Sequence, residues 1–201
     1  MIKAILFDLG GVLVDFAGVG PLLKLSGGIL TEEDAWKFWW KSEVVRSFEK
    51  GKITPEIFAE GVINGLSLNL TPEAFLEEFI SWEKGPYSGS LQLLDQLRPN
   101  YFLACLTNNN VTHWDTLLSK ARIDKKFHRC YVSYKVGLLK PEPAFYKYAL
   151  KDMRLAAGDV LFLDDNEENV KTGLELGFQA FQVKGLAEVE SILRENGILY
   201  F

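Results

Sequence analysis

The chain has 201 residues, of which 48% are hydrophobic and 24% carry a charged side chain. These proportions are typical of a globular protein, and the length suits one domain or one domain that carries a smaller insertion. The net charge of −5, without a lysine or arginine run or an apolar stretch long enough to cross a bilayer, argues against nucleic acid and membranes as partners.

The first predicted element is a buried strand over residues 2–8, which ends abruptly in Asp8 and is followed by Gly10 and Gly11. A carboxylate at the end of a buried strand is costly unless it binds a metal, accepts several hydrogen bonds or takes part in chemistry. In open α/β sheets, ligands bind at this end of the strands. Asp8 is therefore the first candidate for a functional residue.

Residues 16–84 contain no convincing strand and predict a helical insertion. Thr31, Thr54 and Thr71 are each followed by acidic residues, and the last two also by a proline. This pattern is typical of helix N-termini, because the threonine caps the helix and proline suits its first position. Gly85-Pro86 is the expected hinge by which the chain returns from the insertion.

Strands and helices alternate over the rest of the chain. The predicted strands cover residues 101–106, 130–133, 160–163 and 178–183, and the predicted helices cover residues 91–97, 111–120, 143–153, 169–176 and 186–195. This alternation predicts an α/β fold with a parallel sheet, helices on both faces and right-handed crossovers. We expect a core domain of residues 1–15 and 85–201 and a helical cap domain of residues 16–84.

Four groups of polar residues follow predicted strands or precede a predicted helix. They are Asp8, Thr107 with Asn108, Lys140, and Asp164 with Asp165. Because the carboxyl ends of parallel strands share one edge, these side chains can meet in one crevice. A nucleophilic carboxylate, a hydroxyl, a cation and an acidic pair together suit phosphoryl transfer. Two adjacent acids repel each other unless a cation lies between them, which favours Mg²⁺ here.

Four motifs hold these residues: Phe7-Asp8-Leu-Gly-Gly-Val-Leu, Leu106-Thr107-Asn108, Leu139-Lys140-Pro-Glu-Pro and Phe162-Leu-Asp164-Asp165-Asn-Glu-Glu-Asn169. These motifs extend over nearly the whole chain. In the order and approximate spacing of the motifs, the chain resembles the haloacid dehalogenase-like superfamily, in the subgroup with a helical cap after the first strand. It is especially similar to the phosphatase domain of soluble epoxide hydrolases and to bacterial sugar-phosphate phosphatases that also begin with Asp-Leu-Gly.

The resemblance implies a Rossmann-like core and a Mg²⁺-dependent phosphatase that acts on a small organic phosphate, with sugar phosphates as one class. Asp8 would attack phosphorus and form an aspartyl-phosphate, which water then hydrolyses. Thr107 and the Asn108 backbone would bind the phosphoryl group, and Lys140 would tie Asp8 to the phosphate. The cap would close over the core and screen water and substrates.

The resemblance also implies a metal site. Its ligands would be Asp8, the Gly10 carbonyl oxygen, Asp165 and, directly or through water, Asp164. Asn169 would order this acidic loop. Arg46 lies where a cap of this kind can point a side chain at the active site, although a plain surface arginine is the alternative. Trp36, Trp39 and Trp40 recur at helical spacing, which favours packing within the cap over a platform for ligands. The alternative is that some of these rings face the crevice and shape substrate choice.

One position departs from the family pattern. Phosphatases of this superfamily usually carry Asp-x-Asp, and the second aspartate protonates the leaving group and then activates water. Here that position is Gly10, so general acid–base help worth about 10²–10⁴-fold in rate is lost. Three hypotheses follow. The leaving group needs little protonation, as in acyl or anomeric sugar phosphates; another group, such as His113 or one from the cap, supplies the proton; or hydrolysis is vestigial and the protein binds a phosphate or a partner.

A 2-haloacid dehalogenase is the other enzymatic alternative. In that branch the aspartate displaces halide from carbon without magnesium, and the acidic loop typically carries serines at the positions of Asp164 and Asp165. Two adjacent acids fit better beside a divalent cation, which favours the phosphatase. Cys105 and Cys130 lie in apolar segments without metal-binding spacing, so we expect free thiols and a reducing cytoplasm. The oligomeric state cannot be predicted.

Overall fold

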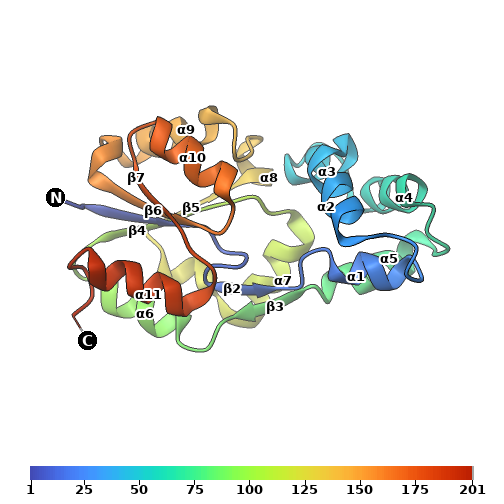
Figure 1. Cartoon of the computed structure of the whole chain (residues 1–201), viewed down its shortest axis with the longest axis horizontal. Coiled ribbons are helices and arrows are strands. Elements are labelled where there is room, and N and C mark those ends of the chain that lie inside the picture. Colours follow the sequence, from blue (N-terminus) through green and yellow to red (C-terminus); the bar gives the residue numbers. More distant parts are fainter. Residues whose placement is uncertain (201) are drawn as a thin grey trace.

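The computed structural model describes residues 1–200 and is built around a five-stranded parallel sheet (Figure 1). Its strands are β1 (Ala4–Phe7), β4 (Phe102–Thr107), β5 (Arg129–Val132), β6 (Val160–Asp164) and β7 (Gln179–Gln182). They lie in the order β5-β4-β1-β6-β7, and each neighbouring pair is parallel. The predicted α/β class is confirmed, and the first strand of the chain occupies the centre of the sheet.

Helices cover both faces of this sheet, as Figure 1 shows. One face carries α6 (Ser90–Leu97), α7 (Val111–Ala121), η1 (Ile123–Lys126) and α11 (Gly185–Glu195), and the other carries α9 (Pro143–Met153) and α10 (Glu167–Glu175). Two short helices remain: α8 (Ser133–Val136) directly follows β5, and η2 (Ala157–Asp159) directly precedes β6. Because side chains alternate along a strand, β1 serves both faces.

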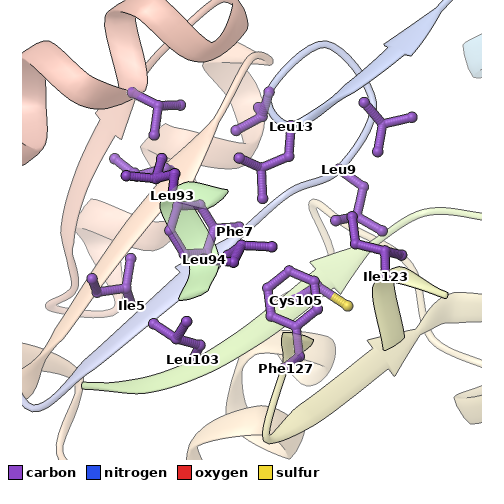
Figure 2. Close-up of a cluster of buried hydrophobic side chains, with 14 of the residues drawn as sticks. Ile5, Phe7, Leu9, Leu13, Leu93, Leu94, Leu103, Cys105, Ile123 and Phe127 are labelled. Carbon is purple, nitrogen blue, oxygen red and sulfur yellow. The ribbon is translucent and has the colours of Figure 1, made fainter. Parts of the chain in front are cut away.

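Alternate residues of β1 illustrate this packing. Ile5 and Phe7 join the cluster that includes Leu93 and Leu94 of α6 (Figure 2), whereas Leu6 joins the cluster on the opposite face. All four residues of β1 are buried. The strand that carries Asp8 is therefore held from both sides, which fixes the position of the carboxylate that follows it.

The expectation of no strand in residues 16–84 is wrong at both ends. Strand β2 (Val14–Phe16) pairs antiparallel with β3 (Glu83–Pro86) in a separate two-stranded sheet. Gly85-Pro86 therefore lies within a strand that pairs with the outgoing chain, rather than forming a bare hinge. The chain enters the helical segment through β2 and leaves it through β3, so these two strands form a ribbon between the segment and the large sheet. Both strands are short and partly polar, and they lack the alternation of apolar and polar residues that makes a strand predictable from sequence.

Between these strands the chain is helical. The helices are α1 (Gly20–Leu25), α2 (Glu32–Lys41), α3 (Glu43–Glu49), α4 (Pro55–Leu66) and α5 (Pro72–Ile80). The predicted N-caps are confirmed, since the hydroxyls of Thr31, Thr54 and Thr71 each accept a hydrogen bond from the backbone N–H three residues later. We call residues 16–84 the cap, and its exact boundaries stay a prediction.

The cap has an aromatic core of its own, which includes Phe48, Phe58, Phe75, Phe79 and Trp82. In Figure 1 its helices form a lobe beside the large sheet, beyond the β2–β3 ribbon. Aromatic pairs such as these contribute packing beyond their buried area. The cap can therefore hold its shape as a unit while it covers one edge of the sheet.

Cys105 and Cys130 face each other in the register of β4 and β5 as free thiols. Cys105 is buried, and burial raises the pKa of its thiol well above the ordinary value. Over residues 1–200, no helix is both long enough and apolar enough to cross a bilayer. The cytoplasmic location stays a prediction.

Candidate active site

Three of the predicted site residues lie where strands of the large sheet end. Asp8 directly follows β1, Thr107 is the last residue of β4, and Asp164 is the last residue of β6. Because β1 lies between β4 and β6 and all three are parallel, their carboxyl ends share one edge. The Asp8 N–H donates to the Leu163 carbonyl at 2.8 Å, so the backbone that carries Asp8 is fixed to β6.

Lys140 bridges two of the carboxylates at this edge. Its Nζ lies 2.9 Å from Oδ1 of Asp8 and 2.6 Å from Oδ2 of Asp164. The side chain is almost fully buried. Burial lowers the pKa of Lys140, but the charges of Asp164 and Asp8 outweigh burial and raise it above the ordinary value. Lys140 is therefore a permanent ammonium group between two buried acids.

The side chain of Asn108 fixes the backbone of Lys140. Its Oδ1 accepts a hydrogen bond from the Lys140 N–H at 2.8 Å, and its Nδ2 donates to the Lys140 carbonyl at 2.9 Å. The sequence predicts only a backbone role for Asn108, so this positioning role of its side chain is an addition. It depends on a contact between residues 32 positions apart, which no local pattern reveals.

Asp8, Asp164 and Asp165 form a carboxylate cluster. One oxygen from each lies within 4.8 Å of the other two. Burial raises the pKa of Asp8 to about 7; Lys140 counteracts this effect, whereas Asp164 and Asp165 reinforce it by repulsion. Hard carboxylate oxygens are the ligands that Mg²⁺ prefers. The donor set therefore fits this ion, which would relieve the repulsion.

The three carboxylates are not equivalent. Asp164 is fully buried, and its Oδ1 accepts hydrogen bonds from the Asn166 N–H and from Nδ2 of Asn169, both at 2.9 Å. Its Oδ2 faces Lys140. Asp8 and Asp165 instead line an open cavity. Asp8 and Asp165 are thus available to a ligand, while Asp164 orients Lys140 and is itself oriented by Asn169.

Gly10 and Gly11 occupy the turn after Asp8 and also line the cavity. A Cβ on Gly10 would meet only Phe16 Cβ, at 3.8 Å. Gly11 has a φ of +74°, and a Cβ there would lie 2.5 Å from Oδ2 of Asp165. Gly11 therefore allows Asp165 to approach the turn closely. The Gly-Gly pair in the sequence indicates a special turn, but it does not reveal this contact with a residue far away in the chain.

The cavity has a volume of about 790 Å³ and lies between the sheet edge and the cap. Thr107, Asn108 and Lys140 line it from the core, and Arg46 and Glu49 of α3 line it from the cap. Thr107 is buried. The predicted site residues therefore meet around one cavity, with Asp164 behind its wall.

Arg46 faces the cavity but is paired. Its Nη2 lies 2.7 Å from Oε1 of Glu142, which also accepts from Nζ of Lys50 at 2.8 Å. Glu142 lies two residues after Lys140 in the core. Arg46 is thus neither a plain surface arginine nor a free cation, because it joins the cap to the loop that carries Lys140.

All three tryptophans of α2 line the cavity. Trp39 packs on Phe58, Phe79 and Trp82 of the cap's core, as the helical spacing predicts. Trp36 also packs against that core. Trp40 stacks on Trp36 with ring centroids 5.1 Å apart and is 57% exposed, so the interpretation as cap core is wrong for Trp40. The sequence does not reveal which face of α2 the lobe leaves open.

His113 is a poor proton donor in this site. Its Nε2 lies 2.7 Å from the Phe79 carbonyl and its Nδ1 lies 3.3 Å from Nδ2 of Asn110. These partners assign a neutral ring that donates from Nε2 and accepts at Nδ1. Burial lowers the pKa of His113 to about 4. Both ring nitrogens are occupied, which argues against the hypothesis that His113 replaces the missing acid.

Comparison with known proteins finds relatives that match most of the chain. The family model for haloacid dehalogenase-like hydrolases matches residues 2–177. The D-ribitol-5-phosphate phosphatase of Bacteroides thetaiotaomicron is 27% identical over 197 residues, which cover 94% of this chain and 95% of that protein. Bifunctional epoxide hydrolase 2 of Rattus norvegicus is 31% identical over 113 residues, or 52% of this chain and 19% of that protein.

Among solved structures, an enzyme of this family from Bacteroides thetaiotaomicron, in complex with magnesium and inorganic phosphate, has a TM-score of 0.76 and 28% identity. The match covers 92% of this chain and 95% of that chain. The extent of both matches confirms the family resemblance that the four motifs predict, and it includes the cap as well as the sheet.

Proposed function

The chain belongs to the haloacid dehalogenase-like hydrolases, and we propose that it is a Mg²⁺-dependent phosphatase that hydrolyses a small organic phosphate through an aspartyl-phosphate on Asp8. The observation that carries this proposal is the Lys140 ammonium group between Asp8 and Asp164, beside Asp165. A nucleophilic carboxylate, a fixed cation and a hard-oxygen metal site are the parts that phosphoryl transfer needs. The match to the D-ribitol-5-phosphate phosphatase of Bacteroides thetaiotaomicron supports the same reaction class.

Asp8, Asp165 and the Gly10 carbonyl oxygen would hold Mg²⁺. When bound, the ion neutralises phosphate charge and orients the phosphoryl group. Asp164 contributes from behind, because its oxygens already accept hydrogen bonds from Lys140, Asn166 and Asn169.

The residues of the chain would act in two steps. In the first, an Asp8 oxygen attacks phosphorus, the bond from phosphorus to the leaving oxygen breaks, and that oxygen keeps the electron pair. In the second, water attacks phosphorus and Asp8 leaves as a free carboxylate. Lys140, the Thr107 hydroxyl and the Asn108 backbone N–H would bind the phosphoryl oxygens throughout.

The part of the substrate beyond the phosphate would contact the cap. The cavity of about 790 Å³ admits a small organic molecule, and its cap side offers Arg46 and the exposed ring of Trp40. A polyol or sugar phosphate matches this mixture of polar and aromatic groups and resembles the substrate named for the Bacteroides phosphatase. We therefore place sugar and polyol phosphates first among the substrate classes.

The test is a panel of sugar, polyol, aryl and acyl phosphates, assayed with Mg²⁺ and with a chelator. The wild type should release phosphate from at least one ester only with Mg²⁺, and Asp8→Asn and Lys140→Met should not. Equal rates for wild type and Asp8→Asn on every substrate would contradict a phosphatase. Chloride release from 2-chloropropionate without metal would favour the dehalogenase instead.

A further inference from the structure

The proposed phosphatase lacks a carboxylate at position 10, so its leaving group needs another source of a proton. Outside the carboxylate cluster and Lys140, the ionisable side chains that line the cavity in residues 1–200 are Arg46, Glu49, Glu83, His113, Glu167, Glu168 and Lys184. We propose that Glu49 of the cap is the general acid–base of this phosphatase, a proposal that rests on the proposed function. Glu49 protonates the leaving oxygen and then takes a proton from the attacking water.

Glu49 is held at the site because residues before and after it in the sequence contact the core. It is the last residue of α3, half-buried, and it lines the same cavity as Asp8 and Gly10. The residue after it, Lys50, bonds to Glu142 in the core, as does Arg46 one turn earlier. The carboxyl end of α3 is therefore fixed to the core on which the phosphate would bind.

The turn after α3 adds a third contact. Gly51 has a φ of +67° and lies so close to the Tyr134 carbonyl oxygen that a Cβ would collide with it. The backbone on the far side of Glu49 is thus pressed against α8 of the core. With Arg46 and Lys50 paired and Gly51 docked, Glu49 is the residue of this segment whose carboxylate is left to the cavity.

The electrostatic setting of Glu49 suits proton transfer. Burial raises its pKa to about 7, while the charge of Arg46, the polar ring N–H of Trp39 and the charge of Lys140 act in the opposite direction. The charged groups that face it are thus Arg46 on its own helix and Lys140 from the core. A group whose pKa is near 7 is present in both protonation states at neutral pH, as an acid–base catalyst requires.

The other candidates fit less well. The pKa of Glu83 is also raised to about 7 by burial, but its Oε1 accepts from the Gly85 N–H at 2.9 Å, and the charged groups that act on it are Lys120 and Asp15. Lys140 influences the pKa of Glu49 and not that of Glu83. His113 has both ring nitrogens occupied. Glu167 and Glu168 are exposed.

The proton balance closes over the two steps. While Asp8 attacks phosphorus and the ester bond breaks, protonated Glu49 gives its proton to the leaving oxygen and an alcohol departs. The Glu49 carboxylate then takes a proton from water as the water oxygen attacks phosphorus and the bond to Asp8 breaks. The cycle ends with a free Asp8 carboxylate, inorganic phosphate and protonated Glu49.

The test compares Glu49→Gln with Glu43→Gln, which changes an exposed glutamate at the other end of the same helix. The substrates are 4-nitrophenyl phosphate, whose leaving group needs little protonation, phenyl phosphate and glycerol 1-phosphate. kcat/KM reports formation of the aspartyl-phosphate. For Glu49→Gln it should fall by about 10²–10⁴-fold on glycerol 1-phosphate, and far less on 4-nitrophenyl phosphate. Glu43→Gln should match the wild type on all three.

An equal loss on all three substrates would indicate a positioning role for Glu49 and overturn the inference. A leaving-group-dependent loss in Glu83→Gln in place of Glu49→Gln would also overturn it. If the wild type exceeds Asp8→Asn on 4-nitrophenyl phosphate but hydrolyses no alkyl ester, the phosphatase proposal holds and the acid–base assignment fails. If the wild type exceeds Asp8→Asn on no substrate, the proposed function itself fails. Circular dichroism and urea midpoints establish that each variant is folded.

Discussion

Arg46 of the cap and Glu142 of the core form an ion pair, with Nη2 and Oε1 2.7 Å apart. Partial burial raises the pKa of Glu142, but Lys50 and Arg46 outweigh it and hold this pKa below its ordinary value. Glu142 follows Lys140 by two residues. The loop that supplies the ammonium group of the site therefore also fastens the cap above it.

Glu142→Gln should weaken this attachment with little loss of stability. Both side chains of the Arg46 pair are about one-third exposed, and such pairs contribute at most about 1 kcal/mol to unfolding. The same energy lost from closure of the cap should reduce kcat/KM by up to about fivefold, mainly through KM. Added salt screens the ion pair, so it should reduce kcat/KM of the wild type towards kcat/KM of the variant. A variant with wild-type KM at both low and high salt would show that the pair does not hold the cap closed.

Gly11→Ala should impair Mg²⁺ binding beyond its effect on folding. Its Cβ would lie 2.5 Å from Oδ2 of Asp165, and its φ of +74° costs an alanine about 1–2 kcal/mol. Gly28→Ala is the matched control, because Gly28 has a φ of +82° but no atom within 4 Å of its Cβ position. Both variants should lose similar stability without metal, measured by urea unfolding.

Only Gly11→Ala should lose the rise in melting temperature that Mg²⁺ gives to the wild type. Ligand that binds the folded state alone stabilises it by about 2.7 kcal/mol at a hundred times the Kd, so this difference is measurable. Equal Mg²⁺ stabilisation of the Gly11 and Gly28 variants would show that Asp165 does not need its close approach to the turn.

Gly10→Asp should install an acid at the position where related phosphatases carry one. The site has room, since a Cβ there meets only Phe16 Cβ, at 3.8 Å. In a Glu49→Gln background, the added carboxyl group should recover kcat/KM on glycerol 1-phosphate by about tenfold or more, out of the 10²–10⁴-fold that such catalysis supplies. Gly10→Asn, of the same size but unable to transfer a proton, should recover nothing. Equal recovery by both would assign the gain to shape rather than to proton transfer.

The sheet and the rim of the site are predictable from sequence for one physical reason. A parallel strand buried on both faces is a continuous apolar run, and the polar residue that ends the run lies at the ligand-binding edge. Asp8, Thr107 and Asp164 are all found in this way. Short polar strands do not give this pattern, which is why β2 and β3 are missed.

The roles that sequence does not reveal depend on contacts between distant segments. The Asn108 side chain holds a backbone 32 residues away, and Arg46 is paired with a residue 96 positions away. Glu49 stands in the charged run Phe48-Glu-Lys-Gly-Lys, which by itself indicates a solvated helix end. Docking of α3 on the core turns that end towards the cavity, and this packing has no local sequence pattern.

His113 should make stability depend on pH, because its pKa is about 4 when folded and has its ordinary value of 6.5 when unfolded. A pKa depressed by folding means that the unfolded chain binds the proton first as pH falls. The stability due to the neutral buried ring is thus complete above pH 6.5 and is lost as pH falls from 6.5 towards 4. Between about pH 7.5 and about pH 5, the expected loss is about 2 kcal/mol.

The measurement is urea unfolding of wild type and His113→Gln at these two pH values. The variant leaves the Phe79 carbonyl less well paired, so it should be less stable than the wild type at both pH values. On acidification, however, the variant should lose about 2 kcal/mol less stability than the wild type loses. Asp8, Glu49 and Glu83, whose pKa values burial raises to about 7, act in the opposite direction and are common to both proteins, so they cancel in the comparison. If the two proteins lose stability in parallel, the His113 ring is charged in the folded protein, and its neutral hydrogen-bonding assignment is wrong.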